Sequence, residues 1–161
     1  MEPIGELVSA SVLDAAGATY RVHRHPAVLG AEDHAISGLD PELSVKTLAF
    51  LIADDRLVLV AVPGLARLGY GQLARALGVS RSQLKAAPAE QLERLGMRPG
   101  GVCPFSPDPS VQVVIDARVM GLPVVYCGSG DPRATIELTP EQLRLACPTG
   151  VIAEVTAPES A

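Results

Sequence analysis

Two apolar runs near the middle of the chain form its clearest hydrophobic pattern. Residues 43–53 and 57–62 are rich in Leu, Val, Ile, Ala and Phe, and the polar triplet Asp-Asp-Arg at 54–56 separates them. Apolar runs of this length on either side of a short polar segment are typical of a β-hairpin. We therefore predict two antiparallel strands joined by a short turn at residues 54–56.

Lys46 is a charged residue inside the first of these runs, and it is one of only two lysines in the chain. Because side chains of a strand alternate between its faces, Lys46 shares a face with Leu48, Phe50 and Ile52 and points toward the core or a pocket. A buried ammonium group needs an ion-pair partner, a wet cavity or an anionic ligand. The other interpretation is that Lys46 lies near the start of the strand and extends into solvent.

The remaining segments alternate between helical and strand-like patterns. Apolar spacing predicts helices at residues 4–16 and 70–77, each followed by a glycine that can end it. Thr139 and Pro140 are typical of the start of a helix, which we expect to run through Leu145. The other expected elements are strands at 19–25, 111–116, 122–127 and 133–138, with short helical turns at 32–36, after Ser80 and after Pro88.

This order of elements indicates the fold class. Hairpin-connected strands with interspersed helices predict an α+β domain built on a mixed, mainly antiparallel sheet with short helices around it. The chain has 161 residues and 48% hydrophobic content, which is enough for one core. We expect a single domain at residues 1–153, followed by a flexible C-terminal tail at residues 154–161 that is small and polar.

Charge and composition limit the possible functions. The net charge of -5 argues against a protein that holds nucleic acid by bulk positive charge, so any such contact must be local or assisted by a partner. The three cysteines form no C-x-x-C pair and are expected to be reduced thiols. The sequence shows neither a secretory signal pattern nor a membrane-spanning apolar run, so we expect a cytoplasmic protein without membrane contact.

The segment at residues 96–105 is a loop with three glycines and two prolines. Pro99 fits the second position of a turn, and Gly100 can adopt a positive φ. The pair Gly100-Gly101 leaves backbone N–H groups open to a ligand, because no Cβ stands in the way. The loop could therefore cradle an oxyanion or a carbonyl oxygen, or it could simply connect two elements tightly.

Two other motifs carry weaker signals. Ser129 lies in Cys-Gly-Ser-Gly-Asp-Pro, which does not satisfy the G-x-S-x-G pattern of a nucleophilic serine, and a turn is the better interpretation. His23 and His25 would face the same side of a strand and, with His34, suggest a metal site. No carboxylate cluster or cysteine pair completes that ligand set, so we expect no metal and no cofactor.

Three segments together resemble a known family. His25-Pro26-Ala27-Val28, Val45-Lys46-Thr47-Leu48 and the 96–105 loop resemble, in order and spacing, the YbaK/prolyl-tRNA synthetase-associated editing domain family. Residues 128–143 look like that family's closing strand and helix, so the resemblance covers nearly the whole chain. It implies a free-standing aminoacyl-tRNA deacylase, which hydrolyses the ester bond of mischarged tRNA in trans without a metal ion.

The resemblance also implies which residues form the site. Lys46 matches the functional lysine of the family, and Gly100 and Gly101 match its substrate-facing glycine loop. The chain departs from the family pattern at Leu29-Gly30 and at Cys103, which affects the expected amino-acid specificity more than the reaction. The residues expected to contact substrate are His25, Thr47, Pro99, Val102, Cys103, Phe105, Gly128, Ser129 and Gly130.

A mechanism can be outlined for such a site. We hypothesise that protonated Lys46 anchors the phosphate or carbonyl side of the substrate, that amides near Gly100 and Gly101 orient the ester, and that a ribose hydroxyl helps to activate water. The expected substrate is a small amino acid, such as alanine or cysteine, on proline tRNA, with an aminoacyl-tRNA synthetase as a helper.

Two rival readings remain open. One is a non-catalytic sensor that uses the same pocket for aminoacylated tRNA ends or nucleotides. The other is a hydrolase of another kind with a metal at His23 and His25.

Overall fold

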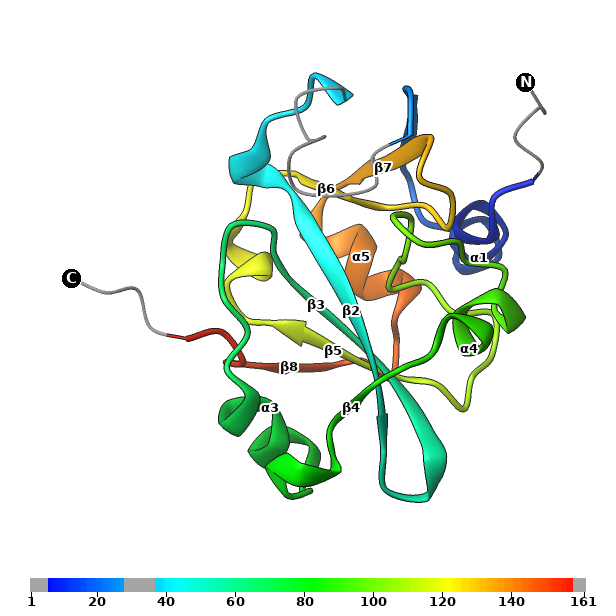
Figure 1. The fold of residues 1–161 in the computed structure, drawn as a ribbon. Helices are drawn as coiled ribbons and strands as arrows, with labels where there is room; N and C mark the ends of the chain where they lie inside the picture. The colour runs from blue at the N-terminus through cyan, green and yellow to red at the C-terminus, as the bar shows by residue number, and fades with distance from the viewer. Residues whose placement is uncertain (1–5, 28–36, 158–161) are drawn as a thin grey trace.

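A computed structural model describes residues 6–27 and 37–157 of the protein, and these residues form an α+β fold with two β-sheets (Figure 1). The three-stranded sheet has the order β1-β7-β6, and the five-stranded sheet has the order β4-β2-β3-β5-β8. The strands are β1 (Arg21–Arg24), β2 (Val45–Ile52), β3 (Arg56–Pro63), β4 (Lys85–Ala86), β5 (Gln112–Asp116), β6 (Val125–Gly128), β7 (Ala134–Leu138) and β8 (Val151–Ala153).

The predicted hairpin is confirmed as β2 and β3. The two strands pair antiparallel from Val45 opposite Pro63 to Ile52 opposite Arg56. The turn between them, Ala53–Asp55, contains two residues with positive φ, Asp54 at 63° and Asp55 at 55°. Aspartate tolerates this left-handed conformation better than most residues, because its short side chain can bond to the local backbone.

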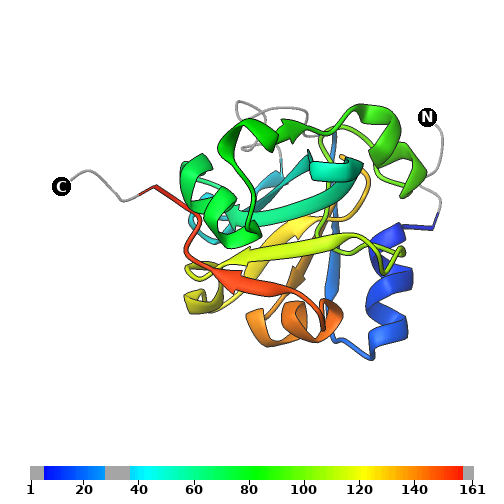
Figure 2. The same cartoon turned by 90° about the horizontal axis from the view of Figure 1, so that it is seen from below.

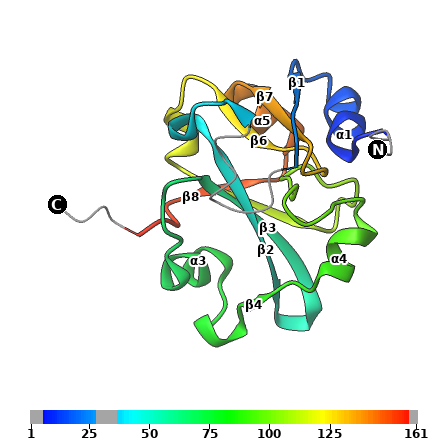
Figure 3. The same cartoon turned by 45° about the horizontal axis from the view of Figure 1, so that its top comes forward.

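The sheets are mainly antiparallel, as predicted, but the strands divide between two sheets. The pairs β1·β7, β6·β7, β2·β3 and β2·β4 are antiparallel, whereas β3·β5 and β5·β8 are parallel. An isolated parallel bridge between Ser44 and Tyr126 connects the start of β2 to β6. Figure 3 shows this junction, where the start of β2 lies beside β6 and β7.

Two hydrophobic clusters cover opposite faces of the five-stranded sheet. Leu59, Ala61 and Ile115 belong to the larger cluster, which includes residues of β6, β7 and α5 (Pro140–Ala146). Val58, Val60 and Val62 belong to the smaller cluster, which includes Leu73 of α3 (Tyr70–Leu77). Figure 2 shows α3 on one side of the sheet and α5 on the other. Burial on both faces explains why β3 is apolar at consecutive positions.

The helix ends follow the predicted signals. Gly17, at φ 71°, ends α1 (Val8–Ala16), and Gly78, at φ 69°, ends α3. Thr139 accepts a hydrogen bond from the Gln142 N–H at the start of α5. Ser80 opens a short 3-10 turn, Arg81–Gln83, and Pro88 precedes α4 (Ala89–Arg94). The helical turn predicted at 32–36 lies outside the described residues.

The segment after β8 differs from the predicted flexible tail. Val155 is fully buried, and its N–H donates to Asp116 Oδ1 at 2.8 Å. The Ala157 N–H donates to the Arg67 carbonyl at 2.7 Å. Residues 154–157 therefore pack against the fold, where the buried carboxylate at the end of β5 supplies acceptors for Val155 and Thr156. Residues 158–161 lie outside the described part of the chain.

Candidate functional site

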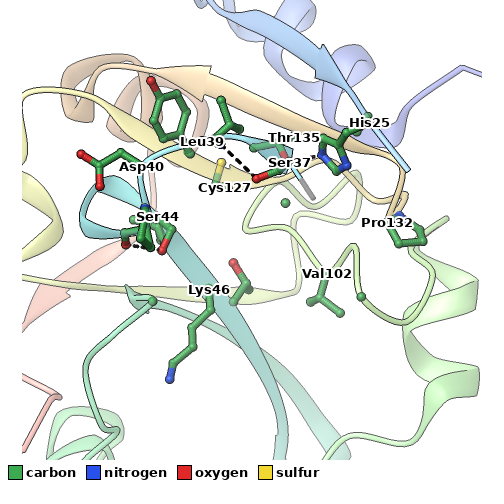
Figure 4. Close-up of a pocket in the computed structure, with 18 residues that line it drawn as sticks. His25, Ser37, Leu39, Asp40, Ser44, Lys46, Val102, Cys127, Pro132 and Thr135 are labelled. Carbon is green, nitrogen blue, oxygen red and sulfur yellow. Dashed lines mark hydrogen bonds between the residues drawn. The ribbon is translucent and has the colours of Figure 1, made fainter. Parts of the chain in front are cut away.

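A cavity of about 270 Å³ lies where the start of β2 meets β6, β7 and the glycine-rich loop (Figure 4). Its wall combines segments far apart in the sequence, and eight of its eighteen residues come from the loop before β2 and from β2 itself. The lining residues are His25, Ser37, Leu39, Asp40, Pro41, Ser44, Val45, Lys46, Thr47, Gly64, Gly100, Val102, Tyr126, Cys127, Gly128, Pro132, Ala134 and Thr135.

Lys46 lies at the rim of this cavity, and its side chain is exposed. Its Nζ donates a hydrogen bond to the Ala66 carbonyl at 2.9 Å, and Figure 4 shows the amine directed away from His25, Thr135 and Val102. The face that Lys46 shares with Phe50 and Ile52 is buried farther along the strand, as predicted, but it is open at Lys46. Of the two interpretations, the exposed one therefore describes the free protein.

The glycine loop contributes Gly100 and Val102 to the cavity. Gly100 has a φ of 82°, as its predicted turn position requires. Neither the Gly100 N–H nor the Val102 N–H takes part in a hydrogen bond among the described residues. Both N–H groups are therefore unengaged in the described part of the chain.

Gly101 has a different role from the one predicted. Its N–H donates to the Arg98 carbonyl at 2.9 Å, and its carbonyl accepts from the Gly130 N–H at 2.6 Å. A Cβ at Gly101 would collide with the backbone of Asp131. Gly101 therefore joins the loop to the 128–131 turn, and its amide is already engaged.

The turn after β6 is structural. The Ser129 hydroxyl is buried and lies 2.7 Å from the Ala134 carbonyl and 2.9 Å from the Asp131 carbonyl. The Arg133 guanidinium contacts the Asp131 carboxylate at 2.9 Å, and this hydrogen bonding lowers the pKa of Asp131. Gly128 lines the cavity, whereas Ser129 and Gly130 do not. The interpretation of this motif as a turn is confirmed.

Three further residues predicted to contact substrate lie away from the cavity. Cys103 and Phe105 are fully buried in the larger hydrophobic cluster. Pro99 does not belong to the cavity wall. These residues follow or precede the two loop positions that do line it, so they support the shape of the loop rather than its ligand-facing surface.

His25 and Thr135 form a hydrogen-bonded pair in the cavity wall. His25 Nδ1 lies 2.8 Å from the Pro26 carbonyl, and Nε2 lies 2.7 Å from Thr135 Oγ1. Because a carbonyl only accepts, the His25 Nδ1 carries a proton and donates to Pro26. The contact between Nε2 and Thr135 Oγ1 joins β7 to the segment that follows β1.

His23 does not join His25 in a metal site. Its Nε2 lies 2.9 Å from Glu137 Oε1, and its ring packs edge-on against Tyr126. Within residues 6–27 and 37–157, no group of three or more His, Cys, Asp or Glu side chains is placed to hold a metal ion. His34, the third histidine of that hypothesis, lies outside these residues.

The sequence model of the aminoacyl-tRNA editing domain matches residues 25–145, a segment that contains all eighteen residues of the cavity wall. The chain belongs to this family. The resemblance found in the sequence is therefore confirmed.

Similar proteins agree with this assignment. The uncharacterized protein YwhH of Bacillus subtilis (strain 168) is 31% identical over 98 residues, which is 61% of this chain and 61% of that protein. The crystal structure of the hypothetical protein APE2540 superposes with a TM-score of 0.79 at 27% identity, over 93% of this chain and 99% of that one. The crystal structure of a candidate trans-editing enzyme for prolyl-tRNA synthetase superposes with a TM-score of 0.79 at 26% sequence identity. The superposition covers 94% of this chain and 96% of that one.

The cysteines of this editing domain are neutral. Burial raises the pKa of the Cys103 and Cys147 thiols to about 12, and it raises the pKa of Cys127 well above its usual range. Cys127 lines the cavity, where its protonated thiol provides an apolar wall and not a nucleophile.

Sequence reasoning missed the loop that precedes β2. Ser37, Leu39, Asp40, Pro41 and Ser44 all line the cavity, and Asp40 accepts a hydrogen bond from the Glu42 N–H at 2.9 Å. The Asp-Pro signal of a helical start directly before the Lys46 strand could have identified this turn. Thr135 was also missed, since its partner His25 is 110 residues away.

No helix in the described residues is long and apolar enough to cross a bilayer.

Proposed function

We propose that this editing domain is an aminoacyl-tRNA deacylase that hydrolyses the ester bond of mischarged tRNA in trans. The observation that carries the proposal is the cavity in the family-matched segment, with a lysine at its rim and two unengaged backbone amides in its wall. The structural similarity to a candidate trans-editing enzyme supports the same activity.

The reaction places distinct demands on the site. Water adds to the ester carbonyl carbon, and the resulting oxyanion collapses as the bond to the ribose oxygen breaks and that oxygen takes up a proton. The N–H groups of Gly100 and Val102 are candidates to stabilise the oxyanion. The Val102 N–H takes the place that we expected for the Gly101 N–H. The Gly101 N–H already donates to the Arg98 carbonyl, so we assign Gly101 to positioning the loop.

Lys46 would bind the nucleic-acid side of the substrate. Among the residues that the structure describes, its side chain is held by the Ala66 carbonyl, a neutral acceptor. A phosphate is a stronger partner for an ammonium group than a carbonyl is, since the hydrogen bond is then charge-assisted on both sides. We infer that Lys46 turns from Ala66 to the terminal nucleotide on binding, that a ribose hydroxyl helps to activate water, and that no metal ion is needed.

The proposed substrate is a tRNA that carries a small amino acid, with proline tRNA as the first choice. The net charge of -5 makes tight binding of a whole tRNA by charge alone unfavourable. A synthetase that holds the tRNA is therefore the proposed partner.

Substitution of Lys46 tests the assignment. Lys46→Ala should lower kcat/KM for deacylation by about 10- to 100-fold, the loss expected when one charge-assisted hydrogen bond to the substrate is removed. Lys85→Ala is the matched control, because Lys85 is the only other lysine and is exposed in β4, outside the cavity wall. Equal rates for the two variants would refute the role of Lys46. Binding of acylated RNA without release of amino acid would instead support the sensor.

A further inference from the structure

The segment that joins β3 to α3, residues 64–69, forms part of the cavity rim, and we call it the rim segment. Gly64 lines the cavity, and the Ala66 carbonyl accepts from Lys46 Nζ at 2.9 Å. Leu65 lies between them and is 69% exposed, more than any other large hydrophobic residue in the described part of the chain. A single exposed leucine is ordinary on a protein surface, so its place matters more than its exposure. Leu65 exposes apolar surface next to the residue that holds the Lys46 amine.

Hydrogen bonds fix the rim segment at both ends. The Gly64 N–H donates to the Ser44 carbonyl at 2.8 Å. At the other end, the Arg67 carbonyl accepts from the Ala157 N–H at 2.7 Å, in the C-terminal segment that Figure 1 shows in red. A surface that is already ordered loses little conformational entropy when a ligand binds, which favours binding.

The rim segment belongs to a basic part of an acidic chain. Residues 56–89 contain five basic residues and no acidic one, although the whole chain has a net charge of -5. Arg67 is exposed, and within residues 6–27 and 37–157 its guanidinium group has no hydrogen-bond or ion-pair partner. The apolar side chain of Leu65 therefore lies in a stretch that carries two cations, Arg67 and the amine of Lys46 on Ala66.

This combination of groups matches the chemistry of a nucleotide. The face of a nucleobase packs against apolar or aromatic side chains, and its phosphates pair with cations. A cavity of about 270 Å³ is too small for a tRNA, so the nucleotide that carries the ester must lie at the rim. The rim segment is in the right place to contact it, because Gly64 belongs to the cavity wall.

We propose that the rim segment is the docking surface for the terminal nucleotide of the acylated RNA. Leu65 packs against the face of the terminal base, and Arg67 binds a backbone phosphate next to the one bound by Lys46. The inference rests on the proposed deacylase function. It assigns RNA binding to this segment and not the choice of amino acid, so its effect is the same for every aminoacyl ester.

The contact of Leu65 is tested with acylated acceptor-stem RNA minihelices. Leu65→Ala should raise KM about 3- to 10-fold and leave kcat unchanged, for alanyl and seryl esters alike. Leu145→Ala is the matched control, because Leu145 is 47% exposed on α5, on the other side of the five-stranded sheet (Figure 2). A minihelix that lacks the terminal base isolates the contact, since Leu65→Ala should not change KM for that substrate.

The contact of Arg67 is tested by the salt dependence of binding to the same minihelices. Arg67→Ala should weaken binding and lower the slope of log Kd against log salt by about 0.7, the value for one phosphate of a single strand. Arg144→Ala is the control, because Arg144 is an exposed arginine of α5. Both rim variants should keep the wild-type thermal midpoint, since both side chains are exposed.

The outcomes separate this inference from the proposed function. If Leu65→Ala and Arg67→Ala behave like the two α5 controls while the esters are hydrolysed, the role of the rim segment is overturned and the deacylase stands. An equal rise in KM with and without the terminal base would overturn the contact between Leu65 and that base. If no ester is hydrolysed, the deacylase proposal fails, and the Kd values of the same variants for an amide-linked aminoacyl minihelix decide the inference alone. A wild type that does not bind this analogue would overturn both.

Discussion

The alternation of side chains along β2 gives two neighbouring residues of the cavity wall opposite degrees of burial. Lys46 is the charged residue of an apolar run, and its amine donates to the Ala66 carbonyl at the rim of the cavity. Its neighbour Thr47 lies on the opposite face, buried in the cavity wall. The two residues therefore differ in environment, with Lys46 exposed at the rim and Thr47 buried in the wall.

Gly128 gives a prediction at the scale of one residue. A Cβ at this position would collide with the Val102 carbonyl, so Gly128→Ala must displace the glycine loop from the turn after β6. Overpacking of this kind costs about 1–3 kcal/mol, and we expect a lower free energy of unfolding by that amount in urea titrations.

Gly121→Ala is the control for this substitution. A Cβ at Gly121 meets no atom within 4 Å, and neither glycine has a positive φ. Its free energy of unfolding should match the wild type. Equal stability of the two alanine variants would show that the contact between Gly128 and Val102 does not constrain the loop.

Asp131 gives a pH-dependent prediction for the turn that carries the site. Its pKa is lowered in the folded state by the Arg133 side chain, so the ionised carboxylate stabilises the fold. That contribution is complete above the unfolded value of about 3.8 and is lost as pH falls below it toward the folded value. Asp131→Asn should be less stable than the wild type at pH 7, and the difference should shrink below pH of about 4.

Thermal unfolding of the wild type and of Asp131→Asn between pH 3 and pH 7 tests this pH dependence. A stability difference that stays constant over the whole range would show that the Asp131 carboxylate is not linked to folding. Because the pKa of Asp131 is lower in the folded than in the unfolded state, acid lowers the stability of the wild type through this group and leaves Asp131→Asn without that loss.

At the scale of elements, local patterns were predicted well and long-range ones were not. The β2–β3 hairpin, the glycine ends of α1 and α3 and the start of α5 depend on neighbouring residues, and all were predicted. By contrast, β4 and β8 have two and three residues and exist only through pairing with strands distant in sequence. A single short apolar segment does not reveal such pairing.

The segment after β8 is a second element whose structure depends on residues distant in sequence. Its polar composition predicted a flexible tail, but the Asp116 carboxylate lies 39 residues away and bonds to it. Val155→Ala should therefore cost about 2 kcal/mol of unfolding free energy, since the Val155 side chain is fully buried.

Val151→Ala is the matched control, because Val151 lies in β8 and is 38% exposed. We expect it to lose much less stability in the same chemical denaturation. A Val155→Ala variant as stable as Val151→Ala would mean that residues 154–157 contribute little to the fold.

At the scale of the whole molecule, the cavity is an assembly of distant segments. The sequence resemblance identified the family and several wall residues, including Lys46, Thr47 and Gly100. It did not reveal the loop at residues 37–44 or the pairing of His25 with Thr135, because these depend on how two sheets meet. It also could not show that the Gly101 carbonyl accepts from the Gly130 N–H of a turn distant in sequence.

The acidic character of the molecule gives a prediction about tRNA. We expect the isolated protein to bind deacylated proline tRNA weakly, because few phosphates are neutralised, and we expect this weak binding to fall further between about 50 and 200 mM salt, because it rests on ion pairs. Filter binding across this range measures the effect. Tight binding that resists salt would contradict the proposed need for a synthetase.

The most direct test of the account is the release of amino acid from a panel of mischarged tRNAs by the wild-type protein with a chelator present. We predict hydrolysis of esters of small amino acids, on proline tRNA first, at rates that the chelator does not change. Full retention of every ester, or activity that disappears on chelation, would contradict the proposal of a metal-independent deacylase.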